Sequence, residues 1–313
     1  MITISVVICT FNRADLLAGA IASLCQQTLP PEQYEIIVVD NASTDGTCQL
    51  VTALTDRYPS HTIVYLYEGQ LGLGYARNTG FKQAQGVYVA YMDDDALLPE
   101  DWLSKSIQLL QTTPQPMCVG GKILPFYTTP KPDWFKDSYA TATWGEEPRL
   151  LRRGESFSGS NMIWRRTALE ASPGFDVHVG VKGHTLSLGE ETILFDQFWQ
   201  QMEQPVFYYA PDLIVQHWVP PFKMKAAYKL KRQFIAGEIQ VYRNGPVHWY
   251  NRPGYFRQEA WKLIRLLGPV LRRRKKHTHL KNWLVEDCYL LAYQLGVVVA
   301  SLGLHIRVKQ GNS

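Results

Sequence analysis

Residues 35–46 read EIIVVDNASTDG, and this stretch decides the fold. Its first half is a run of apolar, mostly β-branched residues, which is typical of a strand buried on both faces. Its second half is a polar turn that opens a helix, which we expect to end at about Tyr58. A buried strand that leads through a turn into a helix is the unit from which parallel sheets are built.

The same alternation of strand and helix patterns continues on both sides of this stretch. Further strands are predicted at 4–9, 62–67 and 87–92, and further helices at 14–25 and 74–84. We therefore expect an α/β fold of the Rossmann-like kind, in which a mostly parallel sheet carries helices on both faces.

Beyond residue 95 the pattern becomes mixed. Helices are predicted at 102–111 and 190–202, strands at 117–124 and 159–164, and a long loop between those strands. From Pro220 onward strand signals nearly vanish, and helical patterns rich in Lys and Arg replace them. These changes predict a sheet-containing domain over 1–220 and a basic, mainly helical region over 221–313.

Charge is distributed very unevenly along the chain. Of the 32 basic and 28 acidic residues, 18 and 4 lie in 222–313, which leaves 14 basic and 24 acidic residues before that point. The acidic first part is a poor surface for nucleic acid and a good one for cations. The basic end should bind anions, either phosphates or an acidic membrane surface.

The cysteines and the N-terminus bear on where the protein is found. The five cysteines include no CxxC pair, which fits small buried thiols in a reducing compartment better than a disulfide framework or a zinc site. The apolar run that begins at Ile2 is short, lacks a basic leader and reads as a strand rather than a targeting signal. We expect a cytoplasmic protein.

Polar clusters follow three of the predicted strands, at 10–13, 40–43 and 93–95. Ligands of open parallel sheets bind at the carboxyl ends of the strands, so these clusters should lie at one edge. Asp93, Asp94 and Asp95 are three adjacent like charges, which are costly together unless a cation or solvent relieves them. Oxygen ligands of this kind suit Mg²⁺ or Mn²⁺, although the triplet could also be a turn that caps the next helix.

Six short stretches follow one another in unbroken order over roughly residues 2–220. They are SVVICTFNR (5–13), IIVVDNASTDGT (36–47), ARNTG (76–80), YMDDD (91–95), SGSNM (158–162) and GEET (189–192). In this order they resemble the family 2 glycosyltransferases, which have the GT-A fold and invert the configuration of the transferred sugar. The Asp triplet looks like the DxD element of that family.

The resemblance implies an enzyme that moves a sugar from a nucleotide-sugar to an acceptor hydroxyl. UDP is the nucleotide that is most frequent among relatives, and the acceptor would be a saccharide or a lipid-linked saccharide in surface polysaccharide or glycolipid synthesis. A divalent cation, Mn²⁺ or Mg²⁺, would bridge the two phosphates and stabilise the leaving nucleoside diphosphate.

The resemblance also implies roles for individual residues. Thr10, Asn12 and Arg13 would line the nucleotide pocket. Asp40 would bond the base, and Arg77 would hold the base or the diphosphate. Asp93 would face the ribose and donor sugar, with Asp94 beside it. Asp95 would bind the metal ion.

A catalytic base is also required, because an acceptor hydroxyl is a weak nucleophile. Glu190 and Glu191 open the helix predicted at 190–202 and are similar to the Glu-Asp base motif of the family, which places Glu191 at the base position and leaves Glu190 as the alternative. Both could instead serve only the helix N-terminus. His217 could complete the metal site or contact the diphosphate, or be a structural histidine.

The basic end contains a segment suited to a membrane surface. Residues 261–276 read WKLIRLLGPVLRRRKK, in which apolar and basic residues interleave as in helices that lie on anionic membranes. The nearly uncharged stretch 290–304 is shorter than the roughly 20 residues of a membrane-spanning helix. We expect peripheral binding to the inner membrane face; the alternative is a solvated basic face on an ordinary helix.

Two other functions compete with a glycosyltransferase. A sugar-phosphate nucleotidyltransferase would show a Gly-rich, basic signature in the first strand–helix loop, where this chain has Thr10 to Arg13. A non-catalytic nucleotide-sugar-binding protein would bind the donor without hydrolysis or transfer.

Overall fold

The computed structural model describes residues 1–112, 114–183, 185–245, 252–304 and 308–309. It divides into two compact units. The sheet unit comprises 1–126, 140–183 and 190–218, and the helical unit comprises 127–139, 184–189 and 219–313. The boundary that the sequence predicts near residue 220 stays a prediction, and two earlier segments cluster with the helical unit.

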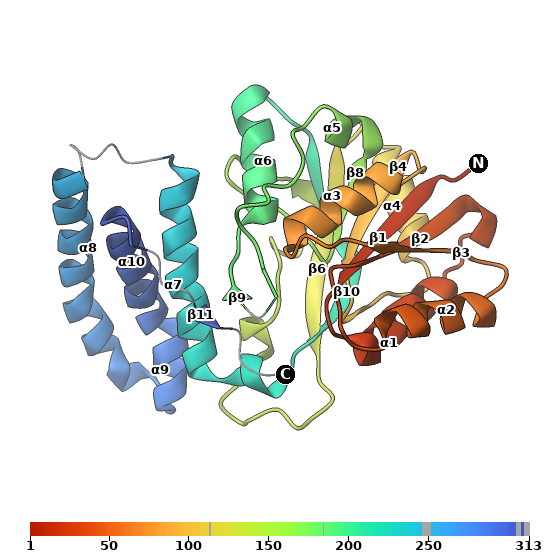
Figure 1. Cartoon of the computed structure of the whole chain (residues 1–313). Helices are drawn as coiled ribbons and strands as arrows, with labels where there is room; N and C mark the ends of the chain where they lie inside the picture. Colours follow the sequence, from red (N-terminus) through yellow and green to blue (C-terminus); the bar gives the residue numbers. More distant parts are fainter. Residues whose placement is uncertain (113, 184, 246–251, 305–307, 310–313) are drawn as a thin grey trace. The chain divides into compact units, whose positions relative to one another are not determined.

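The first four long strands form a parallel sheet in the order β3-β2-β1-β4. Their bounds are Ile4–Thr10 (β1), Tyr34–Asp40 (β2), Thr62–Tyr67 (β3) and Tyr88–Asp93 (β4), and the helices between them are Ala14–Cys25 (α1), Thr47–Arg57 (α2) and Leu73–Gln83 (α3). Figure 1 shows this part in red and orange. The strand and helix predictions for 4–93 are thereby confirmed.

Side chains that alternate along each strand supply two separate cores, one on each face of the sheet. In β1, Val6 belongs to the core that α1 and α2 cover, whereas Val7 belongs to the core that α3 and α6 (Glu190–Gln201) cover. Gly80 allows α3 to approach closely, because a Cβ there would lie 2.3 Å from a methyl carbon of Val7. Helices on both faces of the sheet are thus confirmed (Figure 1).

The rest of the sheet is mixed rather than parallel. Strand β8 (Met162–Arg165) lies antiparallel between β4 and β6 (Cys118–Phe126), and β10 (Phe207–Trp218) runs parallel to β6. The two-residue strands β5 (Ala96–Leu97) and β7 (Arg149–Leu150) pair antiparallel with β10. Antiparallel neighbours need no crossover helix, which is why the long loop between β6 and β8 can connect them directly.

The remaining regular elements of the described residues are short or lie in the helical unit. They are α4 (Trp102–Leu110), α5 (Arg166–Glu170), α7 (Ala226–Arg243), α8 (Arg252–Arg273), α9 (Leu280–Glu286), α10 (Cys288–Ser301), the strands β9 (Thr185–Leu186) and β11 (Val308–Lys309), and 3-10 turns at Pro31–Gln33, Asp137–Tyr139, Pro221–Met224 and Arg274–Lys276. A helical C-terminal region is therefore confirmed.

Helix α10 is the core of the helical unit and packs against α7 and α8. Two glycines let α7 and α10 touch through their backbones: a Cβ at Gly237 would lie 2.0 Å from the carbonyl oxygen of Tyr293, and one at Gly296 would lie 1.9 Å from that of Phe234. Within the described residues, no single helix is long and apolar enough to cross a membrane; only α9 and α10 taken together pass that test, with a bend of 45° between them.

Candidate active site

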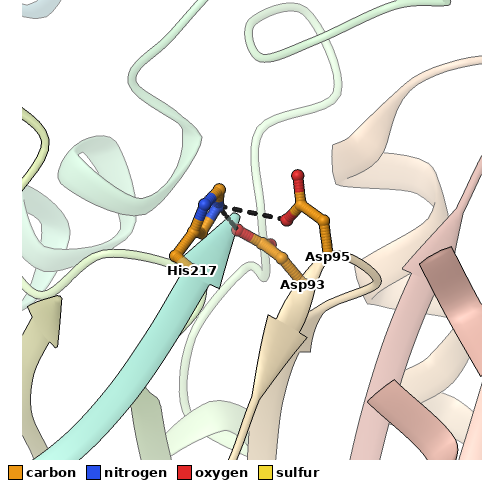
Figure 2. Close-up of side chains that lie close together, drawn as sticks. All are labelled: Asp93, Asp95 and His217. Atoms are coloured by element: carbon orange, nitrogen blue, oxygen red, sulfur yellow. Dashed lines mark ion pairs between the residues drawn. The ribbon is translucent and has the colours of Figure 1, made fainter. Parts of the chain in front are cut away.

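Asp93, Asp95 and His217 meet at the edge where the parallel strands end. Asp93 is the last residue of β4, and the short strand β5 pairs Ala96 with His217 near the end of β10. One ligand atom of each of the three side chains lies within 4.8 Å of the other two (Figure 2). Nε2 of His217 is 3.3 Å from Oδ2 of Asp93 and 3.2 Å from Oδ1 of Asp95.

The hydrogen bond of the other ring nitrogen indicates the tautomer of His217. Nδ1 lies 2.9 Å from the carbonyl oxygen of Trp218, which can only accept, so Nδ1 carries the proton. In the neutral ring Nε2 then directs a lone pair at two carboxylates, which is unfavourable unless a proton or a cation lies between them. Two carboxylate oxygens and one imidazole nitrogen are a donor set that fits a divalent cation such as Mn²⁺.

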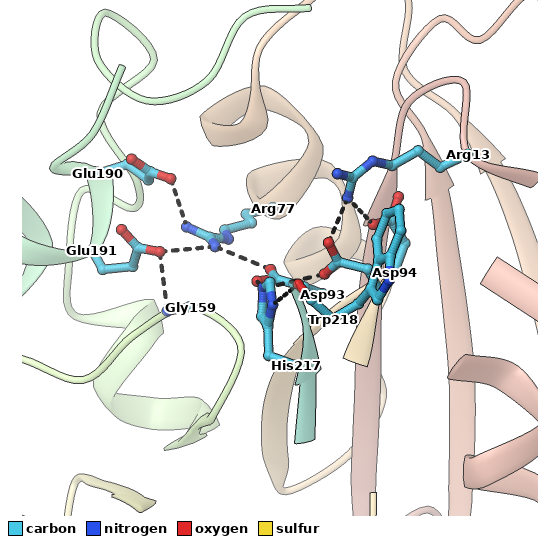
Figure 3. Close-up of polar contacts among 10 residues, drawn as sticks. Arg13, Arg77, Asp93, Asp94, Gly159, Glu190, Glu191, His217 and Trp218 are labelled. Atoms are coloured by element: carbon cyan, nitrogen blue, oxygen red, sulfur yellow. Dashed lines mark hydrogen bonds and ion pairs between the residues drawn. The ribbon is translucent and has the colours of Figure 1, made fainter. Parts of the chain in front are cut away.

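Asp94 is not part of this group of ligands and is buried. Thr10 Oγ1 donates to its Oδ2 over 2.8 Å. Nη1 of Arg13 donates to its Oδ1 over 2.8 Å (Figure 3), and to Oδ2 of Asp95 over 3.0 Å. Burial raises the pKa of Asp94 to about 6, and the charge of Arg13 opposes that rise. Arg13 therefore balances the crowded carboxylates, and the expected contact between Asp94 and the donor stays a prediction.

Asp40 and Asn12 hold together the loops that follow β1 and β2. The carboxylate of Asp40 accepts from the backbone N–H of Ser43 at 2.8 Å and from the hydroxyl of Tyr65 at 2.8 Å, and Asp40 is buried. Asn12 has a φ of 53°, and its Oδ1 accepts from the backbone N–H of Thr44 at 2.7 Å. A nucleotide base at Asp40 would compete with these internal bonds, so both nucleotide roles stay predictions.

A second group of charges surrounds Arg77. Nη2 of Arg77 lies 3.0 Å from Oε1 of Glu191 and 4.0 Å from Oδ1 of Asp93, and Nη1 lies 3.3 Å from Oε1 of Glu190 (Figure 3). Its guanidinium carbon lies 5.2 Å from the ring centre of Phe175. The expected role of Arg77 at the base or diphosphate stays a prediction, whereas the structure adds a link between the glutamates and Asp93.

The two glutamates at the start of α6 differ in access to solvent. The side chain of Glu190 is 4% exposed and that of Glu191 is 19% exposed. Burial, together with the nearby charge of Glu191, raises the pKa of Glu190 to about 8 despite the opposing charge of Arg77. Among the described residues, Oε2 of Glu190 has no hydrogen-bond partner. Glu191 is thus the better placed of the two to meet a substrate.

Gly159 belongs to the candidate site, although no role is predicted for it from the sequence. Its backbone N–H donates to Oε1 of Glu191 at 3.0 Å (Figure 3). A Cβ there would lie 1.8 Å from Nη2 of Arg77 and 2.3 Å from Oε1 of Glu191, so only glycine fits. Gly159 lies in the stretch 158–162, which resembles the family. Its contacts with Arg77 and Glu191, and the contact of Phe175 with Arg77, could not be predicted from the spacing of residues in the sequence.

Comparison with known proteins identifies the family of the chain. The model of the family described as Glycosyl transferase family 2 matches residues 5–170. The glycosyltransferase AglE of Haloferax volcanii is 27% identical over 241 residues, which are 76% of this chain and 73% of the relative. The succinoglycan biosynthesis protein ExoM of Rhizobium meliloti is 26% identical over 241 residues, which are 75% of this chain and 73% of that protein.

Solved structures show the same fold. The mannosyltransferase PcManGT from Pyrobaculum calidifontis, solved with GDP-Man and Mn²⁺, has a TM-score of 0.63 at 19% identity and covers 96% of this chain and 86% of its own. Residues 1–349 of TarS from S. aureus, in complex with UDP, have a TM-score of 0.53 at 16% identity and cover 98% of this chain and 93% of that one. The chain therefore belongs to glycosyltransferase family 2 and has a fold of the GT-A type.

Proposed function

We propose that this glycosyltransferase depends on a divalent metal ion and transfers a sugar from a UDP-sugar, with inversion, to an acceptor in surface polysaccharide or glycolipid synthesis. The observation that carries the metal dependence is the convergence of Asp93, Asp95 and His217 with Nε2 directed at both carboxylates. Mn²⁺ bound with GDP-Man in the related fold supports it. UDP bound to TarS supports the choice of nucleotide.

Asp93, Asp95 and His217 would hold the cation, and Arg13 keeps Asp95 oriented through its bond to Oδ2. Mn²⁺ or Mg²⁺, when bound, supplies positive charge against the diphosphate leaving group. The hydrogen bond from Nδ1 of His217 to the carbonyl of Trp218 fixes the ring, which keeps Nε2 available as a ligand.

Glu191 is the proposed general base. The N–H of Gly159 and the guanidinium of Arg77 both bond Oε1, which leaves Oε2 to accept the proton of the acceptor hydroxyl. The hydroxyl oxygen then forms its bond to the anomeric carbon as the bond to the diphosphate oxygen breaks on the opposite face. A single displacement of this kind inverts the anomeric configuration.

The donor pocket would be formed by the loops that carry Thr10, Asn12, Arg13 and Asp40, which lie at the same edge of the sheet. The acceptor would be a saccharide or a lipid-linked saccharide. The relative named a glucosyl-dolichyl phosphate glucuronosyltransferase, from Haloferax volcanii, and ExoM support that class; the former is 25% identical over 212 residues.

A thermal-shift screen tests the proposal. Purified protein is heated with UDP-sugars or GDP-sugars, each with and without Mn²⁺, alongside His217→Ala and the exposed control His178→Ala. We expect a UDP-sugar to stabilise the wild type and the control only when Mn²⁺ is present, and His217→Ala to lose that dependence.

Donor binding that is equal with and without Mn²⁺ in the wild type would contradict the metal role. A larger shift with GDP-sugars would contradict the choice of UDP. Two assays separate the remaining alternatives: release of pyrophosphate from a nucleoside triphosphate and a sugar phosphate would indicate a nucleotidyltransferase, and binding without hydrolysis or transfer would indicate a non-catalytic binding protein.

A further inference from the structure

Helix α8 carries a stripe of large apolar side chains that face solvent. Trp261, Ile264, Leu267 and Leu271 are 64%, 56%, 44% and 61% exposed, respectively. Their spacing of three or four residues places them on one side of the helix. Exposed apolar residues are common singly, but a continuous stripe along one helix marks an interaction surface.

This stripe is not the face by which α8 joins the helical bundle. Among the residues of α8 whose side chains the structure describes, Val270 and Glu259 are buried. The amide of Gln294 in α10 donates to Oε2 of Glu259 at 2.7 Å, and the indole N–H of Trp283 in α9 donates to the carbonyl of Val270 at 2.8 Å. Helix α8 therefore contacts the bundle through a different face from the one that carries the stripe.

Positive charge lies beside the exposed stripe. Residues 252–276 contain nine Lys and Arg residues and one acidic residue, Glu259. That carboxylate is buried and lies 2.6 Å from the ammonium group of Lys262, so it offers little negative charge to the surface. Arg265 and Arg272 are exposed, and each directly follows a residue of the stripe, Ile264 or Leu271.

We propose that the exposed face of α8 is a docking surface for an anionic lipid bilayer. A bilayer matches both features of this surface, because its anionic headgroups can bind the arginines and the apolar layer beneath them can take up the stripe. Trp261 adds an indole, which favours the boundary between those layers. A soluble anionic polymer would meet the charges but would leave the apolar stripe in water.

The proposal adds a membrane partner to the proposed function and does not depend on it, because lipid binding requires neither donor nor metal. It would bring the enzyme to the cytoplasmic membrane face, where a lipid-linked acceptor is accessible. Helix α10 is not part of this docking surface, because its buried residues, among them Val297 and Val298, pack inside the helical bundle.

Vesicle flotation of the full chain tests the docking surface. One set of vesicles is phosphatidylcholine alone, and the other includes phosphatidylglycerol. We expect the wild type to float with anionic vesicles at least about tenfold better than with neutral ones, and about 0.5 M NaCl to weaken this binding. Trp261→Ser/Leu271→Ser and Arg265→Gln/Arg272→Gln should each reduce it roughly tenfold.

Matched controls separate the surface from general effects. Val87→Ser/Leu150→Ser removes exposed apolar side chains from the sheet unit, and Lys82→Gln/Arg152→Gln removes the same charge there; both should float as the wild type does. Far-UV circular dichroism checks that each variant is folded. Should a variant of α8 fail to fold, the fluorescence difference between the wild type and Trp261→Phe on addition of vesicles supplies the second measurement.

Equal recovery on neutral and anionic vesicles would overturn the proposal, as would α8 variants that bind as tightly as the controls. A concentration-dependent dimer that the α8 variants abolish, without any flotation of the wild type, would instead assign the stripe to a second copy of the chain.

Discussion

Nη2 of Arg77 lies 3.0 Å from Oε1 of Glu191, although the two residues are 114 positions apart in the chain. Arg77 belongs to α3 and is buried, and Glu191 belongs to the first turn of α6. The same guanidinium contacts Glu190 and approaches Asp93. One buried cation thus sits between the proposed base and Asp93, one of the proposed metal ligands, which makes it a positioning residue for both.

Replacing this cation should destabilise the protein strongly. Arg77→Met leaves Glu190 and Glu191 without their shared cation, and breaking a buried ion pair costs about 3–5 kcal/mol. Arg77→Lys keeps the charge but has only one ammonium group, so we expect an intermediate loss. Urea unfolding measures the effect, with the exposed Arg57→Met as control. A change in Arg77→Met no larger than that control would show that Arg77 is not needed to balance the glutamates.

The proposed base can be tested by an isosteric change. Glu191→Gln keeps the shape of the side chain but cannot accept the proton, so kcat should fall by about 10²–10⁴-fold while donor affinity changes little. The control is Glu170→Gln, an exposed glutamate at the end of α5. If Glu191→Gln keeps the wild-type kcat and Glu190→Gln loses it, the base is Glu190.

Gly159 tests the positioning of Glu191 without changing a charge. Gly159→Ala would force its methyl group into Arg77 and Glu191, since the Cβ would lie 2.3 Å from Oε1 of Glu191. A displaced base should lower kcat by about 10²-fold and leave the donor Kd close to that of the wild type. Gly19→Ala is the matched control, because its Cβ would meet Leu97 at an ordinary 3.5 Å. Equal kcat values for the two variants would contradict the positioning role.

Stability should depend on pH through Glu190. Its pKa rises from an ordinary 4.5 to about 8 in the folded protein, chiefly through burial and then through Glu191. The folded state therefore binds the proton more tightly than the unfolded state does, so this contribution to stability is fully present below about pH 4.5 and is lost as the pH rises through about 8.

Glu190→Gln removes that titration and keeps an oxygen for Arg77. We expect the Tm of the variant minus the Tm of the wild type to increase between pH 5 and pH 9. Thermal unfolding across that range measures it, with Glu170→Gln as control. A difference that is constant with pH would show that Glu190 does not carry the shift.

Much of the fold could be predicted because its signals are local. The helix at 14–25 and the strand at 62–67 have the predicted bounds. An amphipathic repeat predicts the helix, and an apolar run with polar residues at its ends predicts the strand. The mixed half of the sheet could not be predicted. The position of β8 between β4 and β6 depends on long-range pairing, and β5 is too short to show a pattern.

The candidate site divides in the same way. Asp93 and Asp95 stood out because they are adjacent charges at a strand end, and their meeting with His217 was suggested only by a family resemblance. The partners of Arg77 left no trace in the sequence, because a contact between α3 and α6 has no period and no motif. Sequence spacing shows which side chains share an edge of the sheet, but not which of them touch.

The position of His217 on β10 has a consequence for folding during translation. Strand β10 is the last strand of the sheet unit to be synthesised, yet it lies within the sheet beside β6 and β5. Until β10 emerges from the ribosome, β6 presents an unpaired edge, and Asp93 and Asp95 lack His217 as a neighbour. A nascent chain that stalls before His217 would therefore lack one of the three proposed ligands and would leave the edge of β6 open to aggregation. Synthesis of β10 supplies the third proposed ligand and covers that edge.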